Sequence, residues 1–163
     1  MVFHLTFDID WAPDCSLEEL LLILDSKNIK ATFFATHKTP INKLIELSKT
    51  NTTNPIILAL DGITDPHNLG AIIRSAEALG CKGILLPQRR SAGLTGTVAK
   101  VAAGALEHIP VSRVVNLNRA LEELKKNGFF IIGLSGDGNL SISNFNEKLP
   151  IVLIIGAEDK GIS

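Results

Sequence analysis

The sequence predicts a single α/β domain, built as a three-layer α/β/α sandwich around a mostly parallel, Rossmann- or flavodoxin-like sheet. Apolar runs of strand length alternate with amphipathic helical stretches along the whole chain. These runs are continuously apolar, which is typical of parallel strands that are buried on both faces. A length of 163 residues and a hydrophobic content of 45% suit one well-buried domain.

Capping and turn signals divide the chain into elements. Ser16 and Glu19 have the spacing of a capping box, and Pro40 is suited to the first turn of a helix. Gly80 and Gly128 stand where two helices are expected to end. The expected helices are 16–27, 40–48, 68–79, 95–106 and 117–126, and the expected strands are 2–7, 31–35, 56–60, 83–86, 109–115, 129–134 and 151–155.

The polar, turn-like stretch 51–55 is the best candidate for a seam within the domain. It divides the chain into an N-terminal βαβα segment, residues 1–50, and a longer α/β core, residues 51–163. Both parts alternate strands with helices, so they are geometrically compatible within one sheet.

Composition and charge favour a cytoplasmic protein. The formal net charge of −1 argues against strong non-specific binding to nucleic acid, but it leaves room for a local basic patch. Cys15 and Cys81 lie far apart without metal-ligand spacing, so we expect reduced thiols. Acidic residues follow the first apolar run directly, which excludes a signal peptide, and no apolar run reaches the roughly 20 residues of a membrane span.

The stretch from Leu60 to Ala76 carries most of the functional information. A strand ends at Leu60, a turn with Gly62 and Pro66 follows, and the next helix carries Arg74 among apolar residues. Polar groups therefore gather where a strand ends, which is where open α/β sheets bind ligands.

Asp61–Ser75 resembles the first motif of the SpoU-type RNA ribose methyltransferases, members of the trefoil-knotted SPOUT superfamily. The resemblance continues through 80–87, 89–95 and 98–105, and Ile154–Ser163 resembles the second motif. It covers about residues 56–163 and is strongest for the branch that modifies a guanosine ribose in large-subunit ribosomal RNA.

The resemblance implies S-adenosylmethionine-dependent methylation of a ribose 2′-hydroxyl. It makes Arg74 the group that stabilises negative charge at the hydroxyl and the adjacent phosphate. Asn68 orients the substrate or the arginine, and Glu158 braces the site by hydrogen bonding. The backbone around Leu134, Ile155 and Gly156 holds the cofactor.

The resemblance also implies RNA as a partner, through a basic patch of Arg89, Arg90, Lys82 and Lys100. The simpler alternatives stay open at each position. Arg74 is otherwise a solvated helix arginine, Asn68 a helix N-cap, Glu158 a loop carboxylate and Gly156 a turn glycine, and the basic residues are an ordinary charged surface. We expect His67 and His108 to be structural.

In this family a third motif, with a Ser-Leu-Asn turn, completes the cofactor pocket and forms the knot and much of the dimer interface. No such turn occurs in these 163 residues. We therefore expect an unknotted fold, weak or absent cofactor binding and catalysis, and a homodimer interface that is at best partial.

The first 48 residues resemble instead the opening of NodB-type polysaccharide deacetylases. Asp8 and Asp10 match that family's paired aspartates, but its His-x-x-x-His pair is absent and His37 stands alone. We expect no metal site, because one His and one Asp make an incomplete coordination shell. Two partial resemblances suggest a chimera, so an engineered structural protein without catalysis is the alternative, and a metal-dependent deacetylase is a weaker one.

Overall fold

The computed structural model describes residues 5–8, 22, 26, 31–34, 39–49, 54–138, 141 and 149–163. The chain divides into two compact units, Met1–His37 and Lys38–Ser163. The candidate seam at 51–55 thus lies within the second unit, and the division comes before it.

The first unit contains two parallel strands, β1 (Leu5–Asp8) and β2 (Ala31–Phe34). Their register runs from Leu5 opposite Ala31 to Asp8 opposite Phe34. Both strands were expected from the sequence. Asp10, Cys15, His37 and most of the expected helix 16–27 lie outside the described residues.

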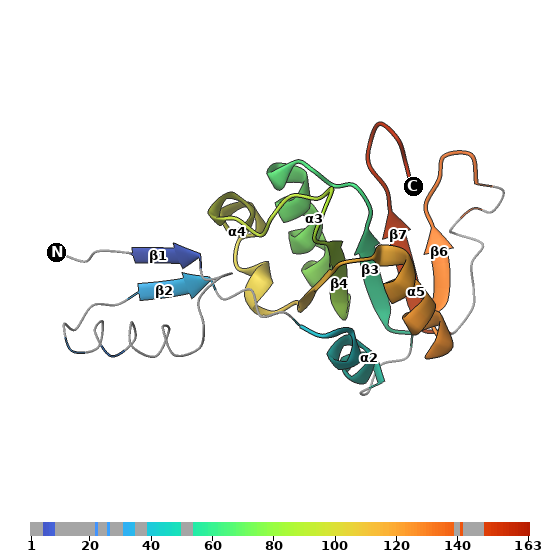
Figure 1. Cartoon of the computed structure of the whole chain (residues 1–163), viewed down its shortest axis with the longest axis horizontal. Helices are drawn as coiled ribbons and strands as arrows, with labels where there is room; N and C mark the ends of the chain where they lie inside the picture. Colours follow the sequence, from blue (N-terminus) through green and yellow to red (C-terminus); the bar gives the residue numbers. More distant parts are fainter. Residues whose placement is uncertain are drawn as a thin grey trace. The chain divides into compact units, whose positions relative to one another are not determined.

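The second unit is built on a five-stranded sheet in the order β5-β4-β3-β7-β6, and every neighbouring pair is parallel (Figure 1). This confirms the parallel α/β class. The strands are β3 (Ile56–Leu60), β4 (Gly83–Pro87), β5 (Val111–Val114), β6 (Phe130–Gly133) and β7 (Ile151–Ile155). The helices are α2 (Ile41–Lys49), α3 (Pro66–Ala78), α4 (Gly96–Ala102), α5 (Leu117–Lys126) and the 3-10 turn η1 (Ala105–Glu107).

Alternate residues of the central strands enter two separate hydrophobic clusters. Leu58 and Leu60 of β3 pack with residues of α3, α4 and η1. Ile57 and Ala59 pack with residues of α2 and α5. Because side chains alternate along a strand, these helices bury opposite faces of the sheet.

Helix α2 belongs to the second unit because its side chains complete the second cluster. Leu44 is fully buried, and its side chain fills the space that a Cβ at Gly83 would occupy. A side chain at the start of β4 would displace Leu44 from this position.

Two helix boundaries differ from the sequence-based expectation. The stretch expected as one helix, 95–106, is broken where Ala103 (φ 50°) and Gly104 (φ 89°) take left-handed conformations. Helix α3 begins earlier than expected, at Pro66, because Asp65 caps it: the amides of His67 and Asn68 both donate to the Asp65 carboxylate at 3.1 Å.

No helix in the described part of the chain is long and apolar enough to cross a lipid bilayer.

Candidate active site

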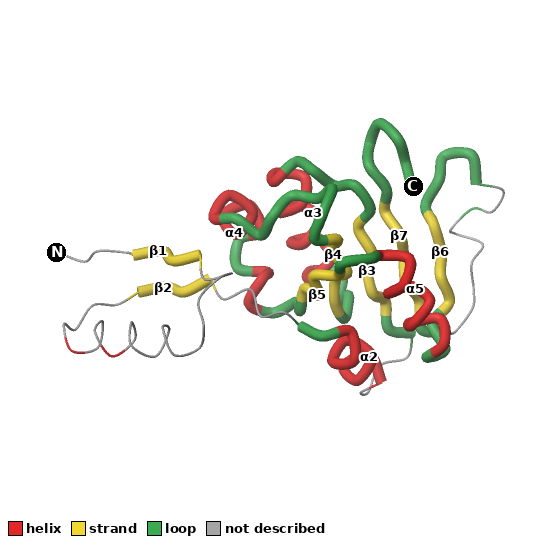
Figure 2. Tube along the Cα trace, in the orientation of Figure 1, coloured by secondary structure: helices red, strands yellow, loops and turns green. Residues whose placement is uncertain are grey.

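The loops that follow β3, β6 and β7 meet at the carboxyl edge of the sheet (Figure 2). The Asp61 amide donates to the Ile155 carbonyl at 2.8 Å, and the Leu134 amide donates to the Ile154 carbonyl at 3.0 Å. The three strand ends are therefore held side by side, at the edge where parallel sheets bind ligands.

The loop after β7 folds back on itself as a tight turn. Ala157 and Gly161 form an antiparallel bridge, with N–H···O distances of 3.0 and 2.8 Å. Gly161 adopts φ +68°, a left-handed conformation that glycine adopts without strain. A Cβ at Gly156 would overlap the backbone of Gly161 and Ile162, so the turn can close only with glycine there.

Asp61 ties the returning loop to the end of β3. Its Oδ2 accepts hydrogen bonds from the Ser163 amide at 2.7 Å and from the Ser163 hydroxyl at 2.8 Å. The next residue, Gly62, has φ +76°, and a Cβ there would lie 3.2 Å from that of Ala157. Asp61 lies in the first motif, but the sequence analysis assigned it no role. Its position directly after a buried strand could have identified it as a site residue.

An exposed apolar surface lies beside this turn. Leu134 is 39% exposed and Ile162 is 37% exposed. A Cβ on Gly133 would lie 2.8 Å from Ile162 Cδ1, so the Ile162 side chain rests against the end of β6. Glycines at positions 133 and 156 let backbone segments approach closely beside the accessible side chains of Leu134 and Ile162. Such a surface suits a ligand with a flat heterocycle and a polar tail. The cofactor-binding residues expected from the sequence, Leu134, Ile155 and Gly156, are thus brought together.

Asn68 and Arg74 lie on α3, which starts at the same edge of the sheet. Both side chains are exposed, and Arg74 makes no hydrogen bond or ion pair with any described residue. Six residues of helix separate them by about 9 Å along the axis and by about 120° around it. The N-cap alternative for Asn68 is wrong, because Asp65 holds that position and Asn68 lies inside the first turn.

Glu158 is exposed in the turn after β7 and makes no side-chain hydrogen bond within the described chain. Neither Asn68 nor Arg74 contacts it through a hydrogen bond or ion pair there. The proposed catalytic roles of these three side chains stay predictions.

The candidate RNA-binding residues come from two elements. Arg89 and Arg90 are exposed in the loop after β4, and Lys100 is exposed on α4. The Ala92 amide donates to the Ile63 carbonyl at 2.8 Å, which joins this loop to the one between β3 and α3. Lys82 precedes β4 and lies at the opposite edge of the sheet, so it is separate from the others.

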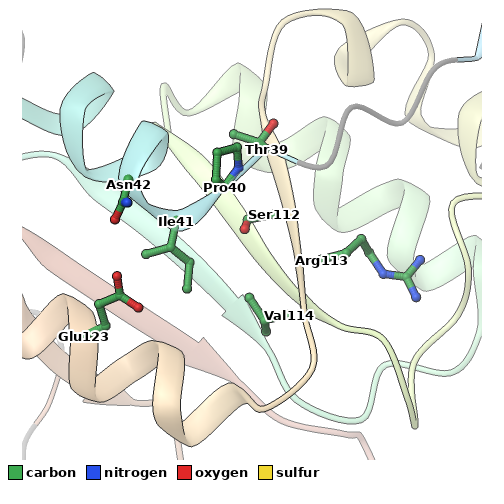
Figure 3. Close-up of a pocket in the computed structure, with 8 residues that line it drawn as sticks. All are labelled: Thr39, Pro40, Ile41, Asn42, Ser112, Arg113, Val114 and Glu123. Carbon is green, nitrogen blue, oxygen red and sulfur yellow. The ribbon is translucent and has the colours of Figure 1, made fainter. Parts of the chain in front are cut away.

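A cavity of about 360 Å³ lies between α2, β5 and α5 (Figure 3). None of the site residues expected from the sequence lines it. Its lining residues are Thr39, Pro40, Ile41, Asn42, Ser112, Arg113, Val114 and Glu123.

No group of three or more His, Cys, Asp or Glu side chains among the described residues could hold a metal ion. His67 and His108 are both exposed. Burial raises the pKa of the Cys81 thiol above its ordinary value, with its backbone hydrogen bond and the nearby Lys82 acting in the opposite direction.

Two protein-family models match the sequence. The model described as "SpoU rRNA Methylase family" matches residues 55–163. A WbmS-like model described as "Polysaccharide deacetylase" matches residues 5–57.

The curated relatives are named as RNA methyltransferases. An uncharacterized tRNA/rRNA methyltransferase of Synechocystis sp. is 46% identical over 155 residues, which cover 95% of this chain and 40% of the relative. A putative TrmH family tRNA/rRNA methyltransferase of Bacillus subtilis is 38% identical, covering 94% of this chain and 61% of the relative. A 23S rRNA (guanosine-2′-O-)-methyltransferase of Pseudomonas aeruginosa is 46% identical, with coverages of 74% and 49%.

Solved structures share the fold. The SpoU methyltransferase AviRb of Streptomyces viridochromogenes, in complex with the cofactor AdoMet, has a TM-score of 0.67 at 21% identity, covering 100% of this chain and 68% of that chain. The AdoMet-bound rRNA methyltransferase of Sinorhizobium meliloti has a TM-score of 0.67 at 19% identity, with coverages of 98% and 65%.

Proposed function

Because the chain belongs to the SpoU rRNA methylase family, we propose that its site serves S-adenosylmethionine-dependent methylation of a ribose 2′-hydroxyl in RNA. The observation that carries the proposal is the closed turn after β7, which meets the ends of β3 and β6 beside exposed Leu134 and Ile162. The names of the curated relatives support tRNA or rRNA as the substrate class.

Leu134 and the backbone of Ile155 and Gly156 would hold the cofactor, beside the closed turn that only a glycine at position 156 allows. When bound, S-adenosylmethionine would supply the methyl group: the ribose 2′-oxygen bonds to the methyl carbon, the carbon–sulfur bond breaks to leave S-adenosylhomocysteine, and the hydroxyl proton is released to water. The adenine ring suits the apolar surface of Leu134 and Ile162, and the polar tail suits the adjoining backbone.

The chain's own side chains act on the RNA. The Arg74 guanidinium stabilises the negative charge that develops on the 2′-oxygen and holds the adjacent phosphate with paired N–H donors. Its exposure and lack of a partner in the described structure leave those donors available. Asn68 orients the substrate or the arginine. Glu158, which makes no side-chain hydrogen bond within the described chain, braces the site by hydrogen bonding in the complex with substrate. Arg89, Arg90 and Lys100 contact RNA phosphates.

We propose further that this chain alone binds the cofactor weakly and has weak or no activity. The surface of Leu134 and Ile162 is open to water, and residues 158–163 are all exposed. The chain spans 40% and 61% of the lengths of its first two curated relatives. The family's third motif, which closes the pocket, is not among these residues.

Titration with S-adenosylhomocysteine tests the cofactor site. We expect amide chemical shifts to move at residues 61–63, 133–134 and 155–163, with a dissociation constant well above the micromolar range. Shifts confined to the cavity between α2, β5 and α5 would refute the site, and micromolar affinity by calorimetry would refute weak binding.

Transfer of a labelled methyl group to ribosomal RNA tests the reaction. We expect Arg74→Ala to abolish any measurable transfer and Arg119→Ala, an exposed arginine on α5, to preserve it. Where the wild type transfers methyl groups, equal transfer by both variants would exclude Arg74 from the mechanism.

A chimeric origin without catalytic function is the second candidate, favoured by the deacetylase-family match to residues 5–57. Alignments to methyltransferase relatives over 94% and 95% of the chain count against it.

Metal analysis of the purified protein tests the weaker deacetylase alternative, and we expect no bound metal. We also propose a single three-layer domain without a knot, a cytoplasmic location, and a homodimer interface that is at best partial.

A further inference from the structure

Arg113 is a half-buried cation on the edge strand β5 for which no role follows from the motifs. Its Nε is buried and has no hydrogen-bond partner among the described residues. One terminal nitrogen donates to the Gln88 carbonyl at 3.3 Å, and no described carboxylate forms an ion pair with it. Burying the Nε–H without a hydrogen-bond partner removes its hydration and therefore carries a free-energy cost.

Arg113 is among the residues that line the cavity, but its side chain leaves β5 on the opposite side of the sheet from that of Val114. Val114 packs in the cluster of α2 and α5, whereas Val111 packs in the cluster of α3 and α4. Alternation along the strand places Arg113 on the same side as Val111. Figure 3 agrees, since the Arg113 side chain points away from Ile41, Asn42 and Glu123.

On that side Arg113 meets the start of the loop that carries the two exposed arginines. Two consecutive residues of β5 bind the backbone of Gln88. The Gln88 amide donates to the Val114 carbonyl at 2.8 Å, and the Gln88 carbonyl accepts from the Arg113 guanidinium. The far end of the loop is fixed as well, where the Ser91 hydroxyl donates to the Pro87 carbonyl and the Ala92 amide to that of Ile63.

The loop needs such support because its backbone is not relaxed. Arg90 has φ 59°, a left-handed conformation that costs a residue with a side chain roughly 1 kcal/mol or more. Arg89 and Arg90 also repel each other, and their exposed side chains have no partner within the described structure.

We propose that Arg113 is a positioning residue that fixes the Gln88–Ser91 loop so that Arg89 and Arg90 face RNA phosphates. The proposal rests on the proposed function for its RNA partner. The planar, rigid guanidinium of arginine suits the role, because it fixes the direction in which a terminal nitrogen donates to the Gln88 carbonyl. Lysine carries the charge but not this geometry.

RNA binding in a double-mutant cycle tests the proposal. A short fluorescently labelled single-stranded RNA is titrated with wild type, Arg113→Gln, the double variant Arg89→Ala/Arg90→Ala, and all three changes together. We expect Arg113→Gln to weaken binding roughly three- to tenfold, the size of one or two weakened phosphate contacts, and to have almost no effect once both arginines are absent. Arg119→Gln is the control variant, because it removes one exposed positive charge on α5, and it should leave the RNA affinity unchanged. Additive losses would mean that Arg113 contacts RNA itself and would overturn the positioning role.

Hydrogen exchange separates this inference from the proposed function. We expect Arg113→Gln and Arg113→Lys to speed exchange at the amides of Gln88 and Ala92, with the β3 and β7 amides unchanged. Unchanged exchange at Gln88 and Ala92, or wild-type RNA affinity in Arg113→Lys, would refute the positioning role. If the wild type binds no RNA, the RNA substrate is refuted, and the exchange data alone decide whether Arg113 fixes the loop.

Discussion

Gly156 decides whether the turn after β7 can close. The backbone of Gly161 and Ile162 occupies the space of any side chain at this position. The same turn places Ile162 beside Gly133 and Leu134, so the cofactor surface depends on a residue that contributes no side chain.

We predict that Gly156→Ala weakens S-adenosylhomocysteine binding at least about tenfold, since the turn must open to admit a methyl group and tenfold corresponds to only about 1.4 kcal/mol. Gly136→Ala is the matched control, because a Cβ there meets nothing within 4 Å. Titration by NMR measures both variants. Equal affinities would show that the closed turn is not required.

Cys81 supplies a pH-dependent probe at the other edge of the sheet. Burial raises the pKa of its thiol, partly offset by a hydrogen bond to its backbone and by Lys82. A raised pKa means that the folded state prefers the neutral Cys81 thiol over the thiolate. This preference stabilises the fold fully at pH values below the pKa of the thiol in the unfolded chain. The stabilisation is lost as the pH rises through the pKa of the thiol in the folded protein.

In a Cys15→Ser background, we therefore predict that iodoacetamide modifies Cys81 more slowly at pH 8 than it modifies an unstructured cysteine peptide. The free energy of unfolding in urea should fall above pH 9 by more than it does in the Cys15→Ser/Cys81→Ser variant. Peptide-like alkylation rates at pH 8 would contradict the burial of this thiol.

At the scale of elements, the pairing of α3 with α4 depends on Gly70. A Cβ there would lie 2.7 Å from Val101 Cβ and 2.9 Å from the Val98 carbonyl oxygen. The second contact is with backbone, so rotation of a side chain cannot relieve it.

Gly70→Ala sets two effects against each other. Helix propensity gains about 1 kcal/mol from alanine, whereas overpacking costs about 1–3 kcal/mol. Because the clash involves the α4 backbone, we predict a net loss of about 1–2 kcal/mol in urea unfolding. Gly96→Ala, at the start of α4 with open space around it, should not destabilise the protein. A stabilised Gly70→Ala variant would show that α3 and α4 separate at little cost.

The sequence predicts best those helices and strands whose ends are marked by neighbouring capping, glycine or proline residues. Helix 117–126 was expected as observed, because the side chain of Asn116 caps its start and Gly128 follows its end. Strands 56–60 and 151–155 also match, since a proline precedes each apolar run and Asp61 or Gly156 follows it. The break at Ala103 was missed because small residues suit both a helix and a tight turn.

The candidate site was harder to predict because its contacts join distant parts of the chain. Asp61 and Ser163 are 102 positions apart, and nothing local assigns one to the other. The strand order β5-β4-β3-β7-β6 is equally non-local, and it is this order that brings the ends of β6 and β7 beside β3. The family resemblance supplied Leu134, Ile155 and Gly156, but not Asp61, whose carboxylate binds Ser163 after the turn.

At the scale of the molecule, the described hydrophobic core belongs to the second unit. Its two clusters draw their buried residues from Leu44 to Ile154, and α2 contributes fully buried Leu44 together with Ile45. A boundary after His37 keeps α2 in the same unit as the five-stranded sheet, whereas a boundary at 51–55 separates α2 from that sheet.

Two truncations distinguish these boundaries. We predict that a chain beginning at Lys38 unfolds cooperatively, with nearly the stability of the full chain and with its S-adenosylhomocysteine affinity, because it keeps both clusters and the turn after β7. A chain beginning at Asn51 lacks Leu44, whose loss alone costs about 2–5 kcal/mol, and leaves Gly83 and the face of β4 uncovered. Against a total stability of about 5–15 kcal/mol, this truncation should abolish or strongly weaken cooperative unfolding. Thermal and urea unfolding, followed by circular dichroism, measure both. Equal stability of the two truncated chains would mean that α2 is not part of this core.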